Sequence, residues 1–248
     1  MDTENKYGTL EVQKQLLELI KHFDDFCKKN HIEYSLNDGT LLGAVRHDGF
    51  IPWDDDLDVI MDRRNYTKLT KLNFEGSGMC LNRVLWLDRV QFIQERAFKK
   101  SIPTLDVFIL DVAPKTRMCR IMKKLMICFL QGIIKGRPNY SKFSFIYKCL
   151  SFITYIIGLF FPIKLKIKLY HIISSKLGSK TSNYASCYFE PYNEIGILHK
   201  VDVLDSLVMH KFENTMLPIM SNFHDYLTEM YGDYMTPPRE EDRIPLHI

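Results

Sequence analysis

The sequence predicts an α+β protein in which helices pack on one face of a sheet and a basic, apolar helical segment is added. Strand patterns and helix patterns are mixed along the chain rather than alternating regularly. The chain has 248 residues, 46% hydrophobic and 25% charged, which is enough for one sizeable core. Residues 115–180 contain 14 Lys or Arg and no Asp or Glu, which sets this segment apart.

The first expected element is a helix over residues 9–29, whose apolar side chains recur at helical spacing. The elements expected after it are a short strand at 33–36, a turn opening a helix at 37–47, a strand at 55–61, a helix at 62–72, strands at 89–98 and 104–112, mostly helix over 116–178, short strands in an irregular stretch at 183–212, a helix at 223–231 stopped by Gly232, and an extended tail from residue 236.

The basic segment is also apolar, since residues 149–163, CLSFITYIIGLFFPI, carry no charge. They are too few for a comfortable transmembrane helix, which needs roughly 20 residues. Lys164, Lys166 and Lys168 follow them, and lysine-flanked apolar helices suit the surface of an anionic membrane. A buried helical subdomain with solvated lysines is the alternative. Nucleic acid is not expected as a partner, because its stacking platforms place aromatic rings among polar residues.

The rest of the chain differs from the basic segment in charge, and the cysteines and the N-terminus indicate the cellular compartment. Outside 115–180 there are 19 basic and 30 acidic residues, so the small net charge of +3 hides a strong asymmetry. The six cysteines form no CxxC pair, and the N-terminus lacks an apolar signal region. We therefore expect a cytoplasmic protein with reduced thiols and no zinc site.

An acidic cluster, Asp54, Asp55, Asp56 and Asp58, directly precedes an apolar run. Because side chains alternate along a strand, Asp56 and Asp58 share one face, Asp54 joins them if the strand begins early, and Asp55 points away. Such carboxylates repel unless a cation lies between them, and oxygen-rich sites suit Mg²⁺ or Mn²⁺. A solvated acidic loop is the alternative.

A calcium-binding EF-hand is a second alternative for this cluster. Asp54, Asp56 and Asp58 match the first half of the EF-hand loop. However, Val59 stands where the loop requires glycine, and Asn65 stands where it requires glutamate. The sequence therefore excludes an EF-hand.

The stretch DGTLLGAVRH lies upstream of the acidic cluster and places Gly39 and Thr40 at a helix start. Backbone N–H groups and a threonine hydroxyl at such a point form a seat for phosphate. Arg46 and His47 follow two turns later and add positive charge. A simple helix cap is the alternative.

A third carboxylate is expected from the strand TLDVFILDV, which offers Asp106 and Asp111 on opposite faces. Asp106 stands among apolar residues, where an unpaired charge is costly, so a metal-binding or proton-transfer role is expected of it. Asp111 precedes Ala113 and Pro114, and strand termination explains it.

These residues carry a family resemblance. DGTLLGAVRHDGFIPWDDDLDVIM closely resembles the signature of the LicD family, which is shared with the fukutin-related proteins. LDVFILDVAP and FENTMLPIMSNFHDYLTEMYGDYMTPP look like two later segments of that family, in the same order. The resemblance covers about residues 10–112 and 212–238 and leaves the basic segment unmatched. It implies a nucleotidyltransferase-like mixed sheet with helices packed on it.

The resemblance also implies an activity: metal-dependent transfer of phosphocholine from CDP-choline to a hydroxyl of a cell-surface glycan precursor, of the teichoic acid or lipopolysaccharide type. Transfer of another phospho-alditol or sugar-phosphate group, or a non-catalytic nucleotide-binding membrane scaffold, remain the alternatives. The family pattern carries over to Gly39 and Thr40 as the helix-start motif, Asp54 as the first aspartate, Asp56 and Asp58 as metal ligands, and Asp106 as the third carboxylate and metal ligand.

Three domains are expected on this basis. They are a nucleotidyltransferase-like catalytic core over 1–114, a basic membrane-associated insert over 115–180, and a C-terminal part over 181–248 that completes the catalytic domain. The expected partners are a CDP-linked donor, a lipid-linked glycan acceptor and an anionic membrane surface. This predicts a peripheral position on the inner face of the cell membrane.

Recognition of a quaternary ammonium group favours an aromatic cage. The candidates, each also explained by core packing, are Phe50, Trp53, Trp86, Tyr231 and Tyr234. Arg239, Arg243 and His247 in the tail are candidates for closing over a nucleotide, although a solvated tail is the favoured interpretation.

Overall fold

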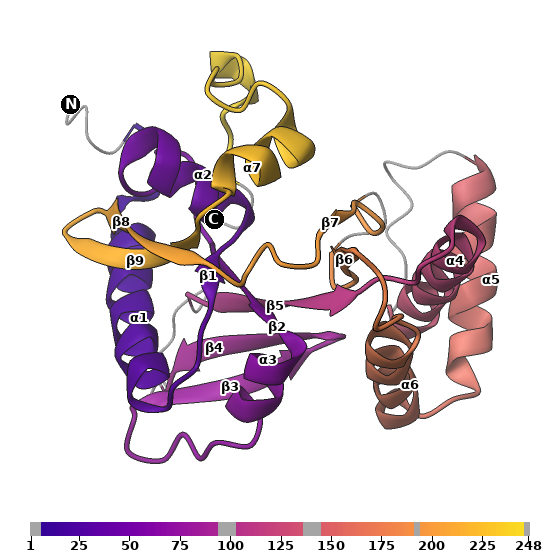
Figure 1. Ribbon diagram of the computed structural model, residues 1–248. Helices are drawn as coiled ribbons and strands as arrows, with labels where there is room; N and C mark the ends of the chain where they lie inside the picture. The colour runs from indigo at the N-terminus through magenta and orange to yellow at the C-terminus, as the bar shows by residue number, and fades with distance from the viewer. Residues whose placement is uncertain (1–5, 94–102, 136–144, 191–193, 246–248) are drawn as a thin grey trace. The chain divides into compact units, whose positions relative to one another are not determined.

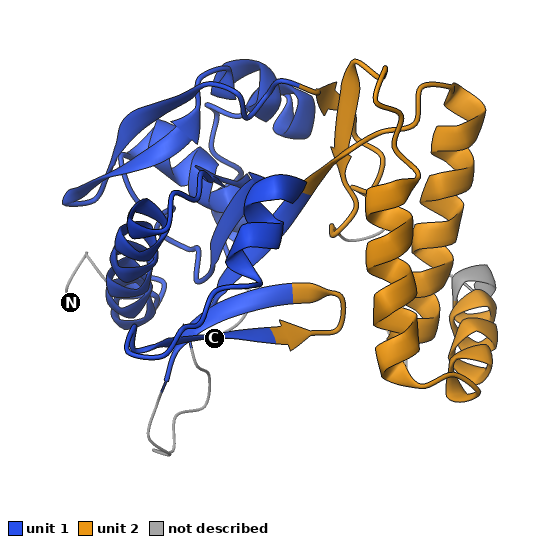
Figure 2. Cartoon of the chain, turned by 60° about the horizontal axis from the view of Figure 1, so that its bottom comes forward, with its two compact units in different colours: residues 1–82, 88–109, 202–248 blue, residues 83–87, 110–201 orange. Residues whose placement is uncertain are grey.

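The computed structural model describes residues 6–93, 103–135, 145–190 and 194–245, in which helices and strands are intermixed (Figure 1). This confirms the α+β class. The chain forms two compact units (Figure 2): unit 1 holds residues 1–82, 88–109 and 202–248, and unit 2 holds 83–87 and 110–201.

The sheet of unit 1 positions the acidic residues. Its strands run in the order β1-β2-β5-β4-β3, and their bounds are β1 Ser35–Leu36, β2 Leu57–Asp62, β3 Met79–Val84, β4 Leu87–Phe92 and β5 Leu105–Val112. β1 pairs antiparallel with β2, and β4 pairs antiparallel with β5, which places Arg89 opposite Asp106. Because β2 and β5 are neighbours, the two strands predicted to carry carboxylates lie side by side.

The helices of unit 1 follow the predicted apolar patterns. α1 (Leu10–Lys29) buries its Leu16, Leu19 and Phe23 face completely, as its spacing predicts. The others are α2 (Asp38–His47), α3 (Arg63–Leu69) and α7 (Phe223–Tyr231). Gly232 ends α7 with a φ of 68°, a conformation that glycine adopts without strain. The predicted starts and stops are confirmed to within one residue for α1, α2 and α7, whereas α3 ends at Leu69 rather than at the predicted residue 72.

Several predictions for the strands and the tail were wrong or incomplete. β3 was not expected, nor was β9 (Thr215–Met220), which forms a separate hairpin with β8 (Leu207–Phe212). Pro218 argues against a central strand in the sequence, but a two-stranded hairpin has a free outer edge that tolerates it. The tail is not fully extended, since Glu240–Asp242 form a 3₁₀ turn. Residues 94–98 of the strand expected at 89–98 lie outside the described residues.

Unit 2 is built mainly from three helices, as predicted for the basic segment. They are α4 (Arg117–Ile134), α5 (Phe145–Leu159) and α6 (Ile163–Lys176). After them, β6 (Tyr184–Cys187) pairs antiparallel with the end of β5 and with β7 (His199–Lys200). α4 and α5 approach closely at two glycines, because a Cβ on Gly132 would stand 2.8 Å from the Thr154 Oγ1 and one on Gly158 would strike the Ile133 carbonyl. Within the described residues no single helix is long and apolar enough to span a membrane; Lys148–Leu159 and Ile163–Lys176, bent by 115°, pass that test only as a pair.

Two buried lysines hold the three helices of unit 2 together. The Lys166 Nζ donates to the carbonyls of Ile133 and Gly158, at 2.9 and 3.1 Å, near the C-terminal ends of α4 and α5. The Lys123 Nζ donates to the Ser174 carbonyl at 2.6 Å, near the end of α6. Each ammonium thereby satisfies carbonyls that a helix end leaves without an intrahelical partner. The expectation that Lys166 flanks a membrane surface was wrong, because it is buried inside unit 2.

Candidate active site

The acidic cluster lies at the start of β2, where Asp54 and Asp56 precede the strand and Asp58 is its second residue. Leu57 and Val59 on either side of Asp58 are fully buried, so the core fixes the strand that carries the carboxylate. Asp58 is itself buried. The strand begins at Leu57 rather than at the predicted residue 55, and Asp55, which was expected to point away from Asp56 and Asp58, is buried.

The N-terminal end of α2 is tied directly to Asp58. The Asp58 N–H donates to the Thr40 hydroxyl at 2.9 Å, and the Asn37 N–H donates to the Asp58 carbonyl at 3.0 Å. Both backbone groups of Asp58 are therefore held by the residues that open α2. Thr40 is buried and has a positioning role in the structure, beside the phosphate contact predicted for it.

Gly39 provides the space that Asp54 occupies. A Cβ at Gly39 would lie 2.7 Å from the Asp54 Oδ2, which is closer than real Cβ atoms approach an oxygen. The loop that carries Asp54 is held in turn by α1, because the Gln13 Nε2 donates to the carbonyls of Ile51 and Asp54 at 3.0 and 2.8 Å. The glycine of the helix-start motif thus brings a carboxylate against the start of α2.

Five carboxylates converge on this point. The pKa of Asp58 is raised well above its ordinary value, first by burial and then by the negative charges of Asp56, Asp38, Asp106 and Asp54. The pKa of Asp54 is raised to about 8, first by burial and then by the charge and the hydrogen bond of Asp56. The site therefore concentrates negative charge that only protons or cations can neutralise.

Asp38 is a member of this group that sequence reasoning missed. It adopts a left-handed φ of 41°, uncommon for a residue with a side chain, and the Asn37 Nδ2 donates to its Oδ2 at 2.8 Å. The Tyr226 hydroxyl of α7 donates to the Asn37 Oδ1 at 2.7 Å, so the C-terminal segment supports the site. An acidic residue immediately before Gly39 was the available signal.

Asp106 is held by an arginine that sequence reasoning also missed. The Arg89 Nε lies 2.8 Å from the Asp106 Oδ1, and the Arg89 Nη2 donates to the Oδ2 at 2.9 Å across the β4–β5 pair. This fork fixes the orientation of the carboxylate as well as its charge. Asp111, by contrast, lies opposite Ser186 in unit 2, where burial and then the charge of Asp111 raise the pKa of the Tyr188 hydroxyl.

A cluster of cations and aromatic rings occupies the C-terminal end of α2. Burial and then the charge of Arg243 lower the pKa of Arg46. Burial and then the charges of Arg46 and Arg243 lower the pKa of His47. The Arg243 guanidinium lies 5.0 Å from the centre of the Trp53 ring, and the His47 ring meets Trp53 edge-on at 6.2 Å. The Arg46 Nη1 donates to the Tyr234 carbonyl at 2.8 Å. Crowded positive charge beside an indole face suits an anion that carries an aromatic ring.

Burial and contacts distinguish the remaining candidates for the aromatic cage and for closing over a nucleotide. Phe50 is buried against Phe212, and Trp86 is buried in unit 2, where its Nε1 donates to the Phe189 carbonyl at 3.0 Å. Arg239 is exposed and pairs with Glu241 and Asp242. The solvated interpretation therefore applies to Arg239 but not to Arg243, and His247 lies outside the described residues.

The carboxylates of this site are candidate ligands for a metal ion. Across the parts of the chain that the structure describes, no group of three or more His, Cys, Asp or Glu side chains is arranged to hold one. The chemistry nevertheless fits a hard divalent cation, because carboxylate oxygens are its preferred ligands. Burial, and after it the charges of neighbouring carboxylates, raises the pKa values of Asp54 and Asp58, and such a cation would compensate their negative charge.

Comparison with known proteins agrees with the motifs. Residues 31–118 match the family described as LicD/FKTN/FKRP, nucleotidyltransferase domain. This range contains the predicted catalytic, metal-binding and phosphate-binding residues, which are Gly39, Thr40, Arg46, Asp54, Asp56, Asp58 and Asp106. The chain is 27% identical over 263 residues to the lipopolysaccharide cholinephosphotransferase LicD of Haemophilus influenzae, an alignment that covers 96% of this chain and 95% of that protein. It is 54% identical over 97 residues to an uncharacterized protein of Rickettsia prowazekii (38% of this chain, 32% of that protein) and 54% identical over 44 residues to one of Rickettsia typhi (18% and 14%).

Proposed function

Because residues 31–118 form a LicD-family nucleotidyltransferase domain and the chain is a phosphotransferase by homology, we propose that it transfers phosphocholine from CDP-choline to a hydroxyl of a lipopolysaccharide-type glycan precursor. The observation that carries the proposal is the convergence of Asp54, Asp56, Asp58 and Asp106 beside the start of α2. Phosphoryl transfer needs mainly positioning and charge stabilisation, which such a site supplies.

Asp56 and Asp58, with Asp106, are the residues we propose to hold a divalent metal, Mg²⁺ or Mn²⁺. Bound there, such an ion would neutralise the diphosphate of the donor and stabilise the departing CMP. Asp58 is the best-positioned ligand, because its backbone is fixed from both sides by Thr40 and Asn37. Asp54, against Gly39, keeps the negative charge of the cluster close to the helix start.

The donor phosphates would be bound by the opening turn of α2, with its Gly39 and Thr40, and by Arg46. The N–H groups at a helix start favour anions. Burial, and after it the charge of Arg243, lowers the pKa of Arg46, and a bound phosphate would compensate both effects. Trp53 and Arg243 add an aromatic face and a positive charge to this surface, which would suit the base ring of a nucleotide. This arrangement supports a nucleotide as the donor rather than a simple phosphate ester.

Asp106 would accept the proton of the attacking sugar hydroxyl or act as the third metal ligand. A positioned proton acceptor contributes typically 10²–10⁴-fold, and the Arg89 fork gives Asp106 a defined orientation for this role. The proton then resides on an Asp106 carboxylate oxygen while the phosphorus–oxygen bond to CMP breaks. Arg89 is a positioning residue in this scheme.

A panel of CDP-linked donors tests the proposal. CDP-choline, CDP-glycerol and CDP-ribitol are each incubated with the full chain, Mg²⁺ and lipid-linked glycan, and CMP release and the mass gained by the glycan are measured. We expect CMP release with a phosphocholine mass increment. A gain from another donor would replace phosphocholine with that group, and nucleotide binding without CMP release would indicate a scaffold instead of an enzyme.

We also propose that the acceptor is lipid-linked and that the protein works as a peripheral protein on the inner face of the cell membrane. The basic, acid-free stretch over residues 115–180 supports an anionic surface as the partner.

A further inference from the structure

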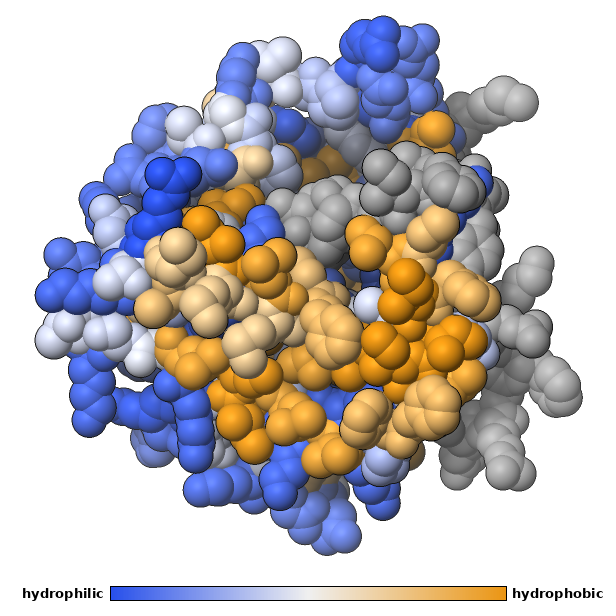
Figure 3. Space-filling model, turned by 90° about the vertical axis from the view of Figure 1, so that its right-hand side faces the viewer, coloured by the Kyte–Doolittle hydropathy of each residue, from blue (hydrophilic) through white to orange (hydrophobic). Residues whose placement is uncertain are grey.

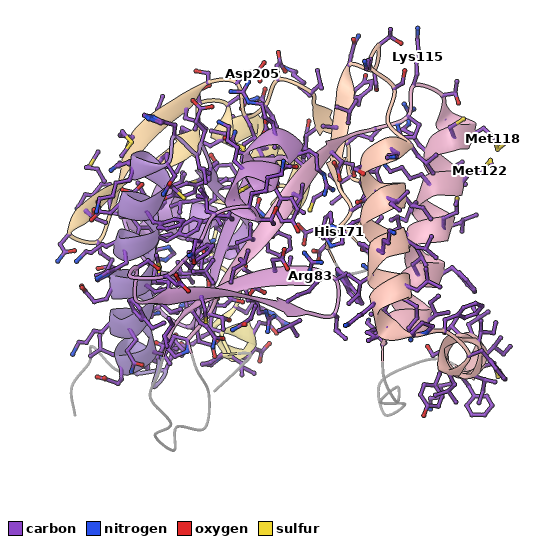
Figure 4. All side chains as sticks on the ribbon, turned by 90° about the horizontal axis from the view of Figure 1, so that it is seen from below. Arg83, Lys115, Met118, Met122, His171 and Asp205 are labelled. Atoms are coloured by element: carbon purple, nitrogen blue, oxygen red, sulfur yellow. The ribbon has the colours of Figure 1, made fainter. Side chains whose placement is uncertain are left out.

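Helix α4 has two apolar faces. One packs inside unit 2 through the buried residues Ile127, Leu130, Ile133 and Ile134. The other consists of Met118, Met122, Leu125 and Phe129, which follow one another at helical spacing and are 67%, 55%, 63% and 45% exposed. Figure 4 shows Met118 and Met122 directed away from the other helices of unit 2. A helix with one face in water normally carries polar residues there, so this second face is adapted to something other than water.

The apolar surface continues over α5 and α6. Its exposed members there are Leu150, Phe152, Ile153, Ile156, Leu159, Phe160, Phe161, Ile163, Leu165, Leu169 and Ile172. Phe160, in the turn between the two helices, is 79% exposed. Figure 3 shows hydrophobic residues gathered into one broad area on this side, with hydrophilic residues at its border. A continuous patch of this kind marks an interaction surface.

The charges around this surface identify the class of partner. Exposed cations of the same segment include Lys115, Arg117, Lys135, Lys164 and Lys168, and residues 115–180 contain no acidic residue to offset them. Protein–protein interfaces are depleted in lysine, whereas apolar helices bordered by lysine and arginine bind the surface of anionic membranes. The two glycine contacts between α4 and α5 add a packing mode common among membrane-embedded helices.

We propose that the exposed face of α4, α5 and α6, which we call the α4–α6 face, inserts into one leaflet of an anionic lipid bilayer. Met118, Met122, Leu125 and Phe160 would enter the acyl region, and the exposed cations would meet the phosphate headgroups. The purpose of this contact rests on the proposed lipid-linked acceptor, but its evidence is the exposure and charge of unit 2 alone. Lys123 and Lys166 are excluded from the headgroup contact, because they are buried on helix-end carbonyls.

Vesicle co-sedimentation of the full chain tests the apolar contribution. The probe is phosphatidylcholine vesicles with and without phosphatidylglycerol, and no donor, metal or glycan is present. We expect binding that requires phosphatidylglycerol and weakens in high salt. The Met118→Gln/Met122→Gln variant should bind the anionic vesicles more weakly by a factor on the order of 10, since two apolar side chains lose their burial in lipid. The matched control is Met209→Gln/Met216→Gln on the β8–β9 hairpin, where both methionines are 49% exposed, and it should bind as the wild type does.

A second pair of variants tests the charge contribution. Lys164→Gln/Lys168→Gln should weaken binding to the anionic vesicles by roughly 10-fold, because each lysine near the surface contributes to attraction. The matched control, Lys29→Gln/Lys71→Gln, removes two exposed lysines from unit 1 and should leave binding unchanged. Thermal unfolding of all four variants checks that each is folded.

Three outcomes would overturn the proposal: a wild type that does not sediment with anionic vesicles, binding that Met118→Gln/Met122→Gln leaves unchanged, or a dimer in sedimentation velocity that Met118→Gln/Met122→Gln abolishes. The proposed function is tested separately with a water-soluble fragment of the acceptor. Met118→Gln/Met122→Gln should transfer to it at the wild-type rate. Absence of transfer with intact vesicle binding would contradict the enzymatic proposal and leave membrane docking standing.

Discussion

Asp106 and Arg89 form the contact that matters most at the scale of single residues. Asp106 alone on a strand among apolar residues would be costly, and the fork of Arg89 compensates its charge while leaving it close enough to raise the pKa of Asp58. The carboxylate is therefore both paired and part of the acidic site. This dual position distinguishes Asp106 from Asp111, which interacts with Tyr188 in unit 2.

The Asp106→Asn variant should lose about 10²-fold or more in kcat while its affinity for the CDP-linked donor stays near normal. The substitution keeps the shape of the side chain but removes the charge and the proton acceptor. Steady-state transfer kinetics and equilibrium donor binding measure the two quantities. Asp111→Asn is the matched control, and a larger loss of kcat in Asp111→Asn than in Asp106→Asn would contradict the assignment.

Gly39 and Asp54 should be energetically coupled, because a Cβ at Gly39 would stand 2.7 Å from the Asp54 Oδ2. We expect Gly39→Ala to destabilise the wild-type protein and to displace Asp54. In an Asp54→Ala background the same change should be neutral or stabilising by up to about 1 kcal/mol, the helix preference of alanine over glycine. Denaturant unfolding of the four proteins of this cycle measures the coupling. Equal effects of Gly39→Ala in both backgrounds would show that the contact is absent.

Sequence reasoning found the aspartates near β2 and in β5 and the helix-start glycine, and it missed Asp38 and the residues whose contacts depend on strand pairing or on α7. The spacing of Asp54, Asp56 and Asp58 identifies them as candidates, and the position of Gly39 at a predicted helix start does the same. Arg89 could not be assigned, because its partner is fixed by the register of β4 on β5, which no local pattern specifies. The contact of Tyr226 with Asn37 depends on α7 in the same way.

At the scale of elements, the three helices of unit 2 depend on two buried ammonium groups. Lys166 serves the C-terminal carbonyls of both α4 and α5. Its position after CLSFITYIIGLFFPI gave no sign of burial, because Lys164, Lys166 and Lys168 look equivalent in sequence. The helical phase of α6 decides which of them turns inward.

The Lys166→Met variant should lower the free energy of unfolding of unit 2 by about 3 kcal/mol, since it removes the charged donor that Lys166 supplies to two buried helix-end carbonyls. Lys168→Met, at an exposed position, should change it by less than about 0.5 kcal/mol. Trp86 lies in unit 2, so its fluorescence in a Trp53→Phe background reports the unfolding of that unit. Equal destabilisation by the two variants would contradict the role of Lys166.

Long amphipathic helices were predicted well, and short strands were not. α1 and α7 have strong periodicity and clear stop signals, so local sequence determines them. β3 and β9 carry weak alternation, and a proline interrupts β9, so only their pairing partners make them strands. The pairing of β8 with β9 is a tertiary outcome that overrides local propensity.

At the scale of the whole molecule, charge is segregated by unit. The acidic cluster lies in unit 1, while residues 115–180, all in unit 2, carry 14 basic residues and no acidic ones. The sequence revealed this segregation, but it could not show which apolar residues of the segment are buried and which are exposed. α4 has apolar residues on its buried face and on its exposed face. Only its packing shows that Ile127 and Leu130 are buried and that Met118 and Met122 are exposed.

The central claim is that the crowded carboxylates of unit 1 serve a metal-dependent transfer reaction, and CMP release from CDP-choline by metal-stripped protein tests it most directly. In EDTA, with acceptor present, we expect no release, and we expect Mg²⁺ or Mn²⁺ to restore it. Asp56→Asn and Asp58→Asn should stay inactive with metal, while Asp58→Asn should be at least as stable as the metal-free wild type because it relieves repulsion. Full CMP release by the metal-free protein would contradict the account.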